Sequence, residues 1–149
     1  MEQEQVQIKK AKPIKAAIIE LGIKKHGSRK GLKVLQAFGG REQAAICGAI
    51  LAARSASIPV LLDGFICTAA AAPLFGASHS SLDHCLFGHL STEPGHKFLL
   101  EAMGKSAILN LNMRLGEGTG AALALSVIRS AVACHNNMAT FKSAGVSSK

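Results

Sequence analysis

The spacing of apolar residues along this chain alternates between the period of a helix and the continuous run of a buried strand. Apolar positions at helical spacing predict a first helix that begins near Pro13 and ends by Gly22, after polar, frayed residues 1–8. Further helices are predicted over residues 32–38, 41–56, 65–75, 94–103 and 119–137. Strands are predicted over residues 58–62, 85–90 and 107–110.

Two of these segments carry a specific expectation about burial. Residues 58–62 are apolar without alternation, which is typical of a central parallel strand covered on both faces. The helix over residues 119–137 is apolar nearly all round, so we expect it to be buried. Alternating strands and helices predict an α/β fold, a Rossmann-like parallel sheet flanked by helices in three layers. Three short strands make a thin sheet, which indicates an incomplete fold.

The length of 149 residues predicts a single domain over residues 1–149. The net charge is +8, and most of the excess lies in the first third of the chain. We therefore divide the domain into a basic N-terminal helix and loop (1–30), a core (31–141) and a flexible tail (142–149). The basic tract suits nucleic acid, a membrane surface or a phosphorylated small molecule, and is also typical of a solvated helix face. The chain has no Trp and no Tyr to stack on bases, so no nucleic-acid partner is expected.

The cysteines and the N-terminus indicate the compartment. The four cysteines lie far apart without a CxxC pair, so we expect buried, reduced thiols in an intracellular protein. The N-terminus has no hydrophobic signal core, and no apolar run reaches the ~18 residues that span a bilayer. The expectation is a cytoplasmic protein with no membrane partner.

Residues 113–123 are the segment most suggestive of chemistry. They place Glu117 between Gly116 and Gly118, just before the last predicted helix. A carboxylate in that setting can act as a general base on a bound molecule, and glycine lets a ligand approach closely. The same segment also fits an ordinary strand-to-helix turn with a solvated Glu117 and Thr119 as the N-cap.

Two other loops follow predicted strands. They contain Asp63-Gly64 and residues 91–93, and the carboxyl ends of parallel strands are where ligands bind. With the Glu117 segment they supply carboxylates, a hydroxyl and helix N-termini, which suits a phosphorylated or carboxylated ligand beside a general base. The lysine of a P-loop is missing and no GxGxxG follows the first strand, so a dinucleotide site is disfavoured.

Other reactive side chains gather between residues 79 and 89. A metal could be held by His79, His84, Cys85 and His89, but their spacing is irregular and a polar loop is favoured. Ser80-Ser81 beside His79 suggests a Ser-His pair, but the GxSxG turn that would present such a serine is missing. We therefore predict no metal and no cofactor.

Five segments occur together in the order and with the gaps of a known enzyme family. On these segments residues 32–146 resemble the C-terminal half of nicotinate-nucleotide–dimethylbenzimidazole phosphoribosyltransferase, which helps to build the nucleotide loop of cobalamin. The segments are residues 39–42 (GGRE), 59–65 (PVLLDGF), 91–96 (STEPGH), 113–122 (MRLGEGTGAA) and 135–141 (HNNMATF).

The resemblance implies a reaction and a set of residues. A nitrogen of dimethylbenzimidazole attacks the anomeric carbon of nicotinate mononucleotide, nicotinate leaves, and α-ribazole phosphate forms. Glu117 would be the general base, and it can be desolvated beside an apolar helix. The residues implied to bind substrate are Ser91 near the nicotinate ring, Leu115 and Gly116 at the base, Asp63 and Gly64 near the ribose phosphate, Gly118 and Gly120 of the same motif, and Lys12 on the phosphate, for which Lys10 and Lys15 compete.

One large departure from the family is visible. The family's N-terminal half, which supplies part of the base pocket and further strands, has no counterpart here. The chain is then either a fragment that works as a homodimer or with the missing half, or a truncated, non-catalytic module that binds a nucleotide or a base. Both alternatives predict an exposed apolar face that needs a partner.

Overall fold

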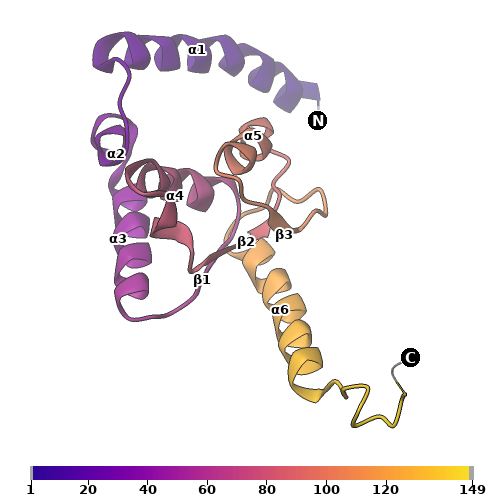
Figure 1. Ribbon diagram of the computed structural model, residues 1–149. Helices are drawn as coiled ribbons and strands as arrows, with labels where there is room; N and C mark the ends of the chain where they lie inside the picture. The colour runs from indigo at the N-terminus through magenta and orange to yellow at the C-terminus, as the bar shows by residue number, and fades with distance from the viewer. Residues whose placement is uncertain (1, 148–149) are drawn as a thin grey trace.

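The computed structural model describes the backbone of residues 2–147 and the side chains of residues 13–147. Its elements follow the predicted alternation of helices and strands (Figure 1). In chain order they are α1 (Glu2–His26), α2 (Leu32–Phe38), α3 (Arg41–Ser55), β1 (Val60–Leu62), α4 (Phe65–Ala77), the 3-10 helix η1 (His79–Leu82), β2 (Cys85–His89), α5 (Pro94–Ala102), β3 (Ala107–Leu109) and α6 (Thr119–Asn137).

The three strands form one parallel sheet in the order β1-β2-β3, which confirms the predicted α/β class. Val60 lies opposite Cys85, and Phe87 lies opposite Ala107. The central strand is therefore β2, and the expectation that residues 58–62 form the central strand is wrong. Within the described residues β1 pairs on one side only, so Val60 and Leu61 are half-buried.

The core lies on one face of this sheet. Alternate residues of β2, Cys85 and Phe87, point into it and meet α3, α4 and α5. Small residues on α4, such as Ala71, let that helix pack closely against the strands. The other core residues are Cys47, Ile50, Leu62, Leu74, Leu82, Leu100 and Met103.

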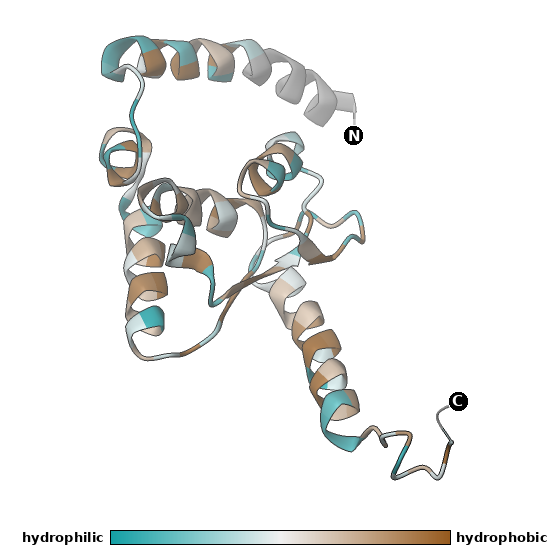
Figure 2. Cartoon of the chain, viewed as in Figure 1, coloured by the Kyte–Doolittle hydropathy of each residue, from teal (hydrophilic) through white to brown (hydrophobic). Residues whose placement is uncertain are grey.

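The opposite face is covered only in part, by the first turns of α6. Gly120 and Ala124 are the buried residues of this helix, while Leu123, Val127 and Val132 are about half exposed. Beyond its first turns α6 projects away from the body, although much of it is apolar (Figures 1 and 2). The expectation that this helix is buried is therefore wrong, because no described element lies against its far end. An apolar stripe predicts a need for cover and not the cover itself.

The first helix also differs from its prediction. It begins at Glu2 and continues through Pro13 to His26. Proline removes one backbone donor, but the flanking Gln, Lys and Ala residues are good helix formers and sustain the helix on either side. Ile14, Ile18 and Leu21 of α1 are exposed. Lys12 lies on this helix, but its side chain is outside the described residues.

The cysteines divide into two groups. Cys47 and Cys85 are buried, and burial raises the pKa of both thiols. Cys67 is half-buried, and Cys134 is exposed on α6, so uniform burial is a wrong expectation. None of the helices in the described part of the chain has both the length and the apolarity needed to cross a bilayer.

Candidate active site

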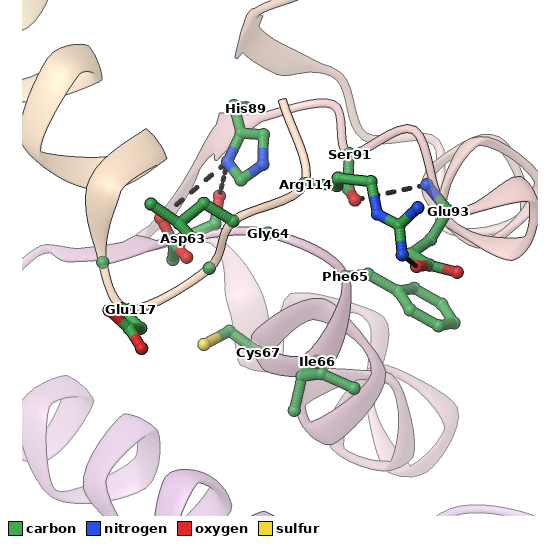
Figure 3. Close-up of a pocket in the computed structure, with 13 residues that line it drawn as sticks. Asp63, Gly64, Phe65, Ile66, Cys67, His89, Ser91, Glu93, Arg114 and Glu117 are labelled. Atoms are coloured by element: carbon green, nitrogen blue, oxygen red, sulfur yellow. Dashed lines mark hydrogen bonds and ion pairs between the residues drawn. The ribbon is translucent and has the colours of Figure 1, made fainter. Parts of the chain in front are cut away.

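Three loops converge where the parallel strands end. They follow β1, β2 and β3, and together they line an open cavity of about 580 Å³ (Figure 3). The carboxyl ends of parallel strands meet at one edge of a sheet, so residues far apart in sequence come together there. The cavity is lined by Asp63, Gly64, Phe65, Ile66, Cys67, His89, Ser91, Glu93, Arg114, Leu115, Gly116, Glu117 and Gly118.

Most of the predicted site residues share this lining. The exceptions are Gly120, which lies behind the lining, and Lys12, whose side chain is outside the described residues. Sequence reasoning did not select Phe65, Ile66, Cys67 or Arg114, and it considered His89 only as a disfavoured metal ligand. A usable signal existed for the first four: residues 65–67 form the first turn of the helix that follows Asp63-Gly64, and Arg114 directly precedes the Leu-Gly-Glu-Gly segment.

The loop that carries Glu117 has an unusual backbone. Gly116, Glu117 and Gly118 have φ angles of 83°, 58° and 81°, so three consecutive residues lie in the left-handed region. Glycine adopts this region freely, whereas for Glu117 it costs about 1–2 kcal/mol. In this conformation Glu117 is exposed and lines the cavity.

The start of α6 differs from the predicted cap. The N-cap residue is Gly118, and Thr119 is the first helical residue. The Thr119 hydroxyl donates a hydrogen bond of 2.8 Å back to the carbonyl oxygen of Gly116, which closes the loop on itself. Glu117 is exposed, so the expected desolvation of its carboxylate is not met within this chain. The cavity is open beside Glu117, so water reaches this carboxylate.

Asp63 ties the end of β1 to the start of α6. Its side chain is 13% exposed, and Oδ1 accepts a hydrogen bond of 2.8 Å from the backbone N–H of Ala121. A carboxylate at a helix N-terminus satisfies a free donor and interacts favourably with the helix dipole. Because Ala121 lies four residues after Glu117, this bond also anchors the Glu117 loop.

His89 fills the space between these two segments. Its ring Nδ1 lies 2.8 Å from the carbonyl oxygen of Asp63, so Nδ1 carries the proton and donates. Nε2 is buried and has no hydrogen-bond partner among the described residues. A Cβ on Gly64 would lie 2.6 Å from the ring, and a Cβ on Gly120 would overlap it. Glycine is therefore required at both positions by the packing of His89.

A second buried histidine joins the loops after β1 and β2. His96, on the first turn of α5, is fully buried. Its Nδ1 lies 2.9 Å from the backbone nitrogen of Ser91, and its Nε2 lies 3.0 Å from Oγ1 of Thr68. The Thr68 hydroxyl donates at 2.8 Å to the carbonyl oxygen of Gly64. Burial lowers the pKa of His96, and the charge of nearby His89 lowers it further.

The outer edge of the cavity is charged and exposed. Arg114 and Glu93 form an ion pair at 3.8 Å, with side chains 71% and 47% exposed. Such exposed pairs contribute little to stability, typically about 0–1 kcal/mol. Leu115 is 71% exposed and presents an apolar surface beside this pair. The edge thus offers both charge and an apolar contact to a bound molecule.

The other candidate clusters do not assemble. His79 stacks on Phe75 with ring centroids 4.6 Å apart, and the Ser80 hydroxyl meets Ser78 at 3.2 Å. Cys85 Sγ lies 3.8–3.9 Å from the ring nitrogens of His84, while His89 turns toward Asp63. Within the described part of the chain no three His, Cys, Asp or Glu side chains are grouped to hold a metal ion.

The fold and the cavity define an α/β protein with an open cavity at the carboxyl edge of a parallel sheet. The model of a phosphoribosyltransferase family matches residues 6–146. The chain therefore belongs to this phosphoribosyltransferase family.

Two relatives are named nicotinate-nucleotide–dimethylbenzimidazole phosphoribosyltransferase. The one from Rhodobacter capsulatus is 57% identical over 132 residues, which cover 89% of this chain and 40% of the relative. The one from Brucella anthropi is 60% identical over 116 residues, which cover 78% of this chain and 34% of the relative. The chain thus spans less than half the length of these relatives.

A solved structure has the same fold over most of this chain. It is the enzyme of that name from Thermus thermophilus, with a TM-score of 0.74 and 44% sequence identity. The match covers 83% of this chain and 37% of that one.

Proposed function

We propose that this chain carries part of the active site of an enzyme that transfers the phosphoribosyl group of nicotinate mononucleotide to dimethylbenzimidazole, as a pentosyltransferase in cobalamin nucleotide-loop assembly. One observation carries the proposal: three loops far apart in sequence bring Asp63, Ser91 and Glu117 to one cavity. Membership of the phosphoribosyltransferase family and the names of the relatives support it.

Glu117 is the proposed general base. A benzimidazole nitrogen forms a bond to the anomeric carbon while the bond from that carbon to nicotinate breaks, and nicotinate leaves with the electron pair. The attacking base loses its N–H proton to the Glu117 carboxylate. A positioned general base typically contributes about 10²–10⁴-fold to the rate. The exposed, strained position of Glu117 allows its carboxylate to meet a ring that enters the cavity from solvent.

The phosphate end is proposed to lie at the start of α4. Gly64 is the N-cap of this 13-residue helix, and the first turn that follows lines the cavity. Free backbone N–H groups at a helix N-terminus favour an anion. Asp63 lies beside this position, with Oδ1 already occupied by Ala121. Its role is then to place the two flanking helices, so that it lies near the ribose phosphate without needing to bind it.

The remaining assignments follow the same arrangement. Ser91, nearly buried beside Gly64, faces the nicotinate nucleotide, and Leu115 with Gly116 forms part of the surface for the benzimidazole. Gly118 belongs to the same loop, whereas Gly120 acts by making room for His89. A lysine of α1, Lys12 or its neighbours Lys10 and Lys15, supplies a positive charge for the phosphate.

The rest of the site is proposed to come from outside this chain. The chain spans 40% and 34% of the two relatives, and its cavity and α6 are open to solvent. We infer that it works as one domain of residues 1–149, in the cytoplasm, either as a homodimer or together with the N-terminal half of the family. No nucleic acid or membrane takes part in this proposal.

Incubation of the purified chain with nicotinate mononucleotide and dimethylbenzimidazole, followed by mass spectrometry for α-ribazole phosphate, tests this proposal. Product is expected from the chain or from the chain mixed with the N-terminal segment of the Rhodobacter capsulatus relative. Glu117→Gln should slow its formation about 10²–10⁴-fold, whereas Glu101→Gln, a change on the exposed face of α5, should leave the rate unchanged. If the folded chain forms no product either alone or with the N-terminal segment, the proposed transferase activity is contradicted.

A second function is favoured by the exposure of Glu117. A general base open to water is poorly placed for catalysis, whereas the cavity is still able to hold a ligand. The chain would then be a non-catalytic module that binds a nucleotide or a base. Binding of nicotinate mononucleotide by calorimetry without turnover in either mixture would select this function.

A further inference from the structure

A buried line of hydrogen bonds connects two walls of the cavity. It runs from the backbone N–H of Ser91 to His96, from His96 to Thr68, and from Thr68 to the carbonyl oxygen of Gly64. The bonds measure 2.9, 3.0 and 2.8 Å. Ser91 and Gly64 line the cavity, whereas His96 and Thr68 are 0% and 1% exposed and lie behind it.

The direction of these bonds is determined by their two ends. A backbone N–H can only donate, so Nδ1 of His96 must accept and carries no proton. A backbone carbonyl can only accept, so the Thr68 hydroxyl donates to Gly64 and its oxygen is free to accept from Nε2–H of His96. All three hydrogen bonds can form with only one placement of the protons, in which His96 is neutral and protonated on Nε2.

This arrangement suits a residue that holds others in place. Protonation of Nδ1 would turn an acceptor into a donor facing the Ser91 N–H, and burial already disfavours the charged ring. Because His96 does not line the cavity, it acts on a ligand through the lining residues that it holds: Ser91, Gly64 by way of Thr68, and Phe65, whose ring centroid lies 5.8 Å from that of His96. The hydroxyl of Ser91 meanwhile accepts a hydrogen bond of 3.2 Å from the backbone N–H of Glu93, which orients that side chain within the loop.

We propose that His96 is a positioning residue: as a neutral imidazole protonated on Nε2, it holds the Ser91 amide and, through Thr68, the Gly64 carbonyl at the spacing that the nicotinate mononucleotide end of the site requires. The ligand named here rests on the proposed function. The preformed spacing of the two loops rests on the hydrogen bonds alone.

Two substitutions of His96 each remove one of its two hydrogen bonds and keep the other. In His96→Asn the side-chain oxygen can take the place of Nδ1 and accept from Ser91, while the bond to Thr68 is lost. In His96→Gln the amide nitrogen can take the place of Nε2 and donate to Thr68, while Ser91 loses its acceptor. Both replacements are neutral amides, so a role in general packing alone predicts similar effects from the two.

Amide hydrogen exchange of Ser91 and calorimetric binding of nicotinate mononucleotide are the measurements. His96→Asn should retain the protection of the Ser91 amide and bind within about three-fold of the parent. His96→Gln should expose that amide and weaken binding about ten-fold, because a buried N–H is left without an acceptor. Thr68→Val keeps Ser91 bonded to His96 and should therefore retain the protection of the Ser91 amide, although it removes the donor to the Gly64 carbonyl.

The unsubstituted chain provides a further test that needs no variant to fold. Long-range proton–nitrogen correlation spectra of His96 should show a bare Nδ1 and a protonated Nε2. The opposite tautomer, or equal loss of Ser91 protection in His96→Asn and His96→Gln, would overturn the proposal. If the parent chain binds no nicotinate mononucleotide, the proposed function fails, and the tautomer and the exchange data still decide the role of His96.

Discussion

The cavity has a buried frame and an exposed rim, and the two differ in what holds them. The frame comprises Asp63, Thr68, His89, Ser91 and His96, which are buried or nearly so and are held by hydrogen bonds to one another or to backbone groups. The rim comprises Glu93, Arg114, Leu115 and Glu117, which are exposed. The fold of this chain therefore fixes the positions of the frame side chains, whereas the rim side chains are free to contact a bound molecule. Substitutions in the frame should alter stability first, and those in the rim should alter chemistry first.

The largest expected effect falls on the rim. Glu117→Gln removes the proposed base but keeps the size of the side chain, so the rate of α-ribazole phosphate formation should fall about 10²–10⁴-fold. The free energy of unfolding should change by no more than about 0.5 kcal/mol, since the side chain is exposed. Both quantities can be measured on one preparation, by product formation and by urea unfolding. A loss of stability that accounted for the lost activity would contradict the division into frame and rim.

The next effect concerns the frame. Gly120→Ala places a Cβ within the space of the buried His89 ring, so the chain should lose about 3 kcal/mol of stability through overpacking. The matched control is Gly48→Ala on α3, where a Cβ meets nothing within 4 Å. That change should stabilise the helix by about 0.5–1 kcal/mol. Urea unfolding of the two variants gives the comparison, and a neutral Gly120→Ala would show that His89 can move aside.

Asp63 allows a smaller test of the same frame. Asp63→Ala leaves the N–H of Ala121 without an acceptor, which should cost about 1–3 kcal/mol. Asp63→Asn keeps an acceptor oxygen and loses only the charge at the helix N-terminus, worth about 0.3–1 kcal/mol. Unfolding free energies and exchange of the Ala121 amide measure the difference. Similar losses from both variants would mean that charge, and not the hydrogen bond, fastens α6.

The positions of the helices, strands and loops were largely predictable, because they follow from local spacing and chain order. The loops at Asp63, Ser91 and Glu117 follow three parallel strands, whose carboxyl ends meet at one edge in any such sheet. Their convergence on one cavity therefore needed no knowledge of side-chain contacts. This is why most of the predicted site residues share a lining.

The contacts of the frame and the exposure of α6 were not predictable in this way. His96 meets Thr68 across 28 residues of sequence, and Asp63 meets Ala121 across 58, so these pairs depend on packing that local spacing does not report. The apolar pattern of α6 describes its surface and says nothing of whether a partner lies against it. For the same reason, Val60–Leu62 is an edge strand within the described residues although its sequence is typical of a central one.

The backbone of the rim yields a further comparison. Glu117 has φ = 58°, so Glu117→Gly should be more stable than Glu117→Ala by about 1 kcal/mol, because glycine avoids the strain of the left-handed region. Both variants lack the carboxylate and should form product about 10²–10⁴-fold more slowly than the parent chain. Thermal or urea unfolding measures the difference. Equal stabilities would show that the loop is not held in this conformation in solution.

The smallest effect we expect is a pH dependence of the frame. Burial lowers the pKa of His96 below its ordinary 6.5, and the charge of His89 lowers it further. The unfolded chain then binds a proton more readily than the folded chain, so the contribution of His96 to stability is complete above its unfolded pKa and falls as the pH drops below it. Urea midpoints at about pH 7.5 and about pH 5.5 measure this loss. His96→Asn has no ring to titrate and should show a shallower decline; an equal decline in both would assign the pH dependence to other groups and leave the frame insensitive to acid.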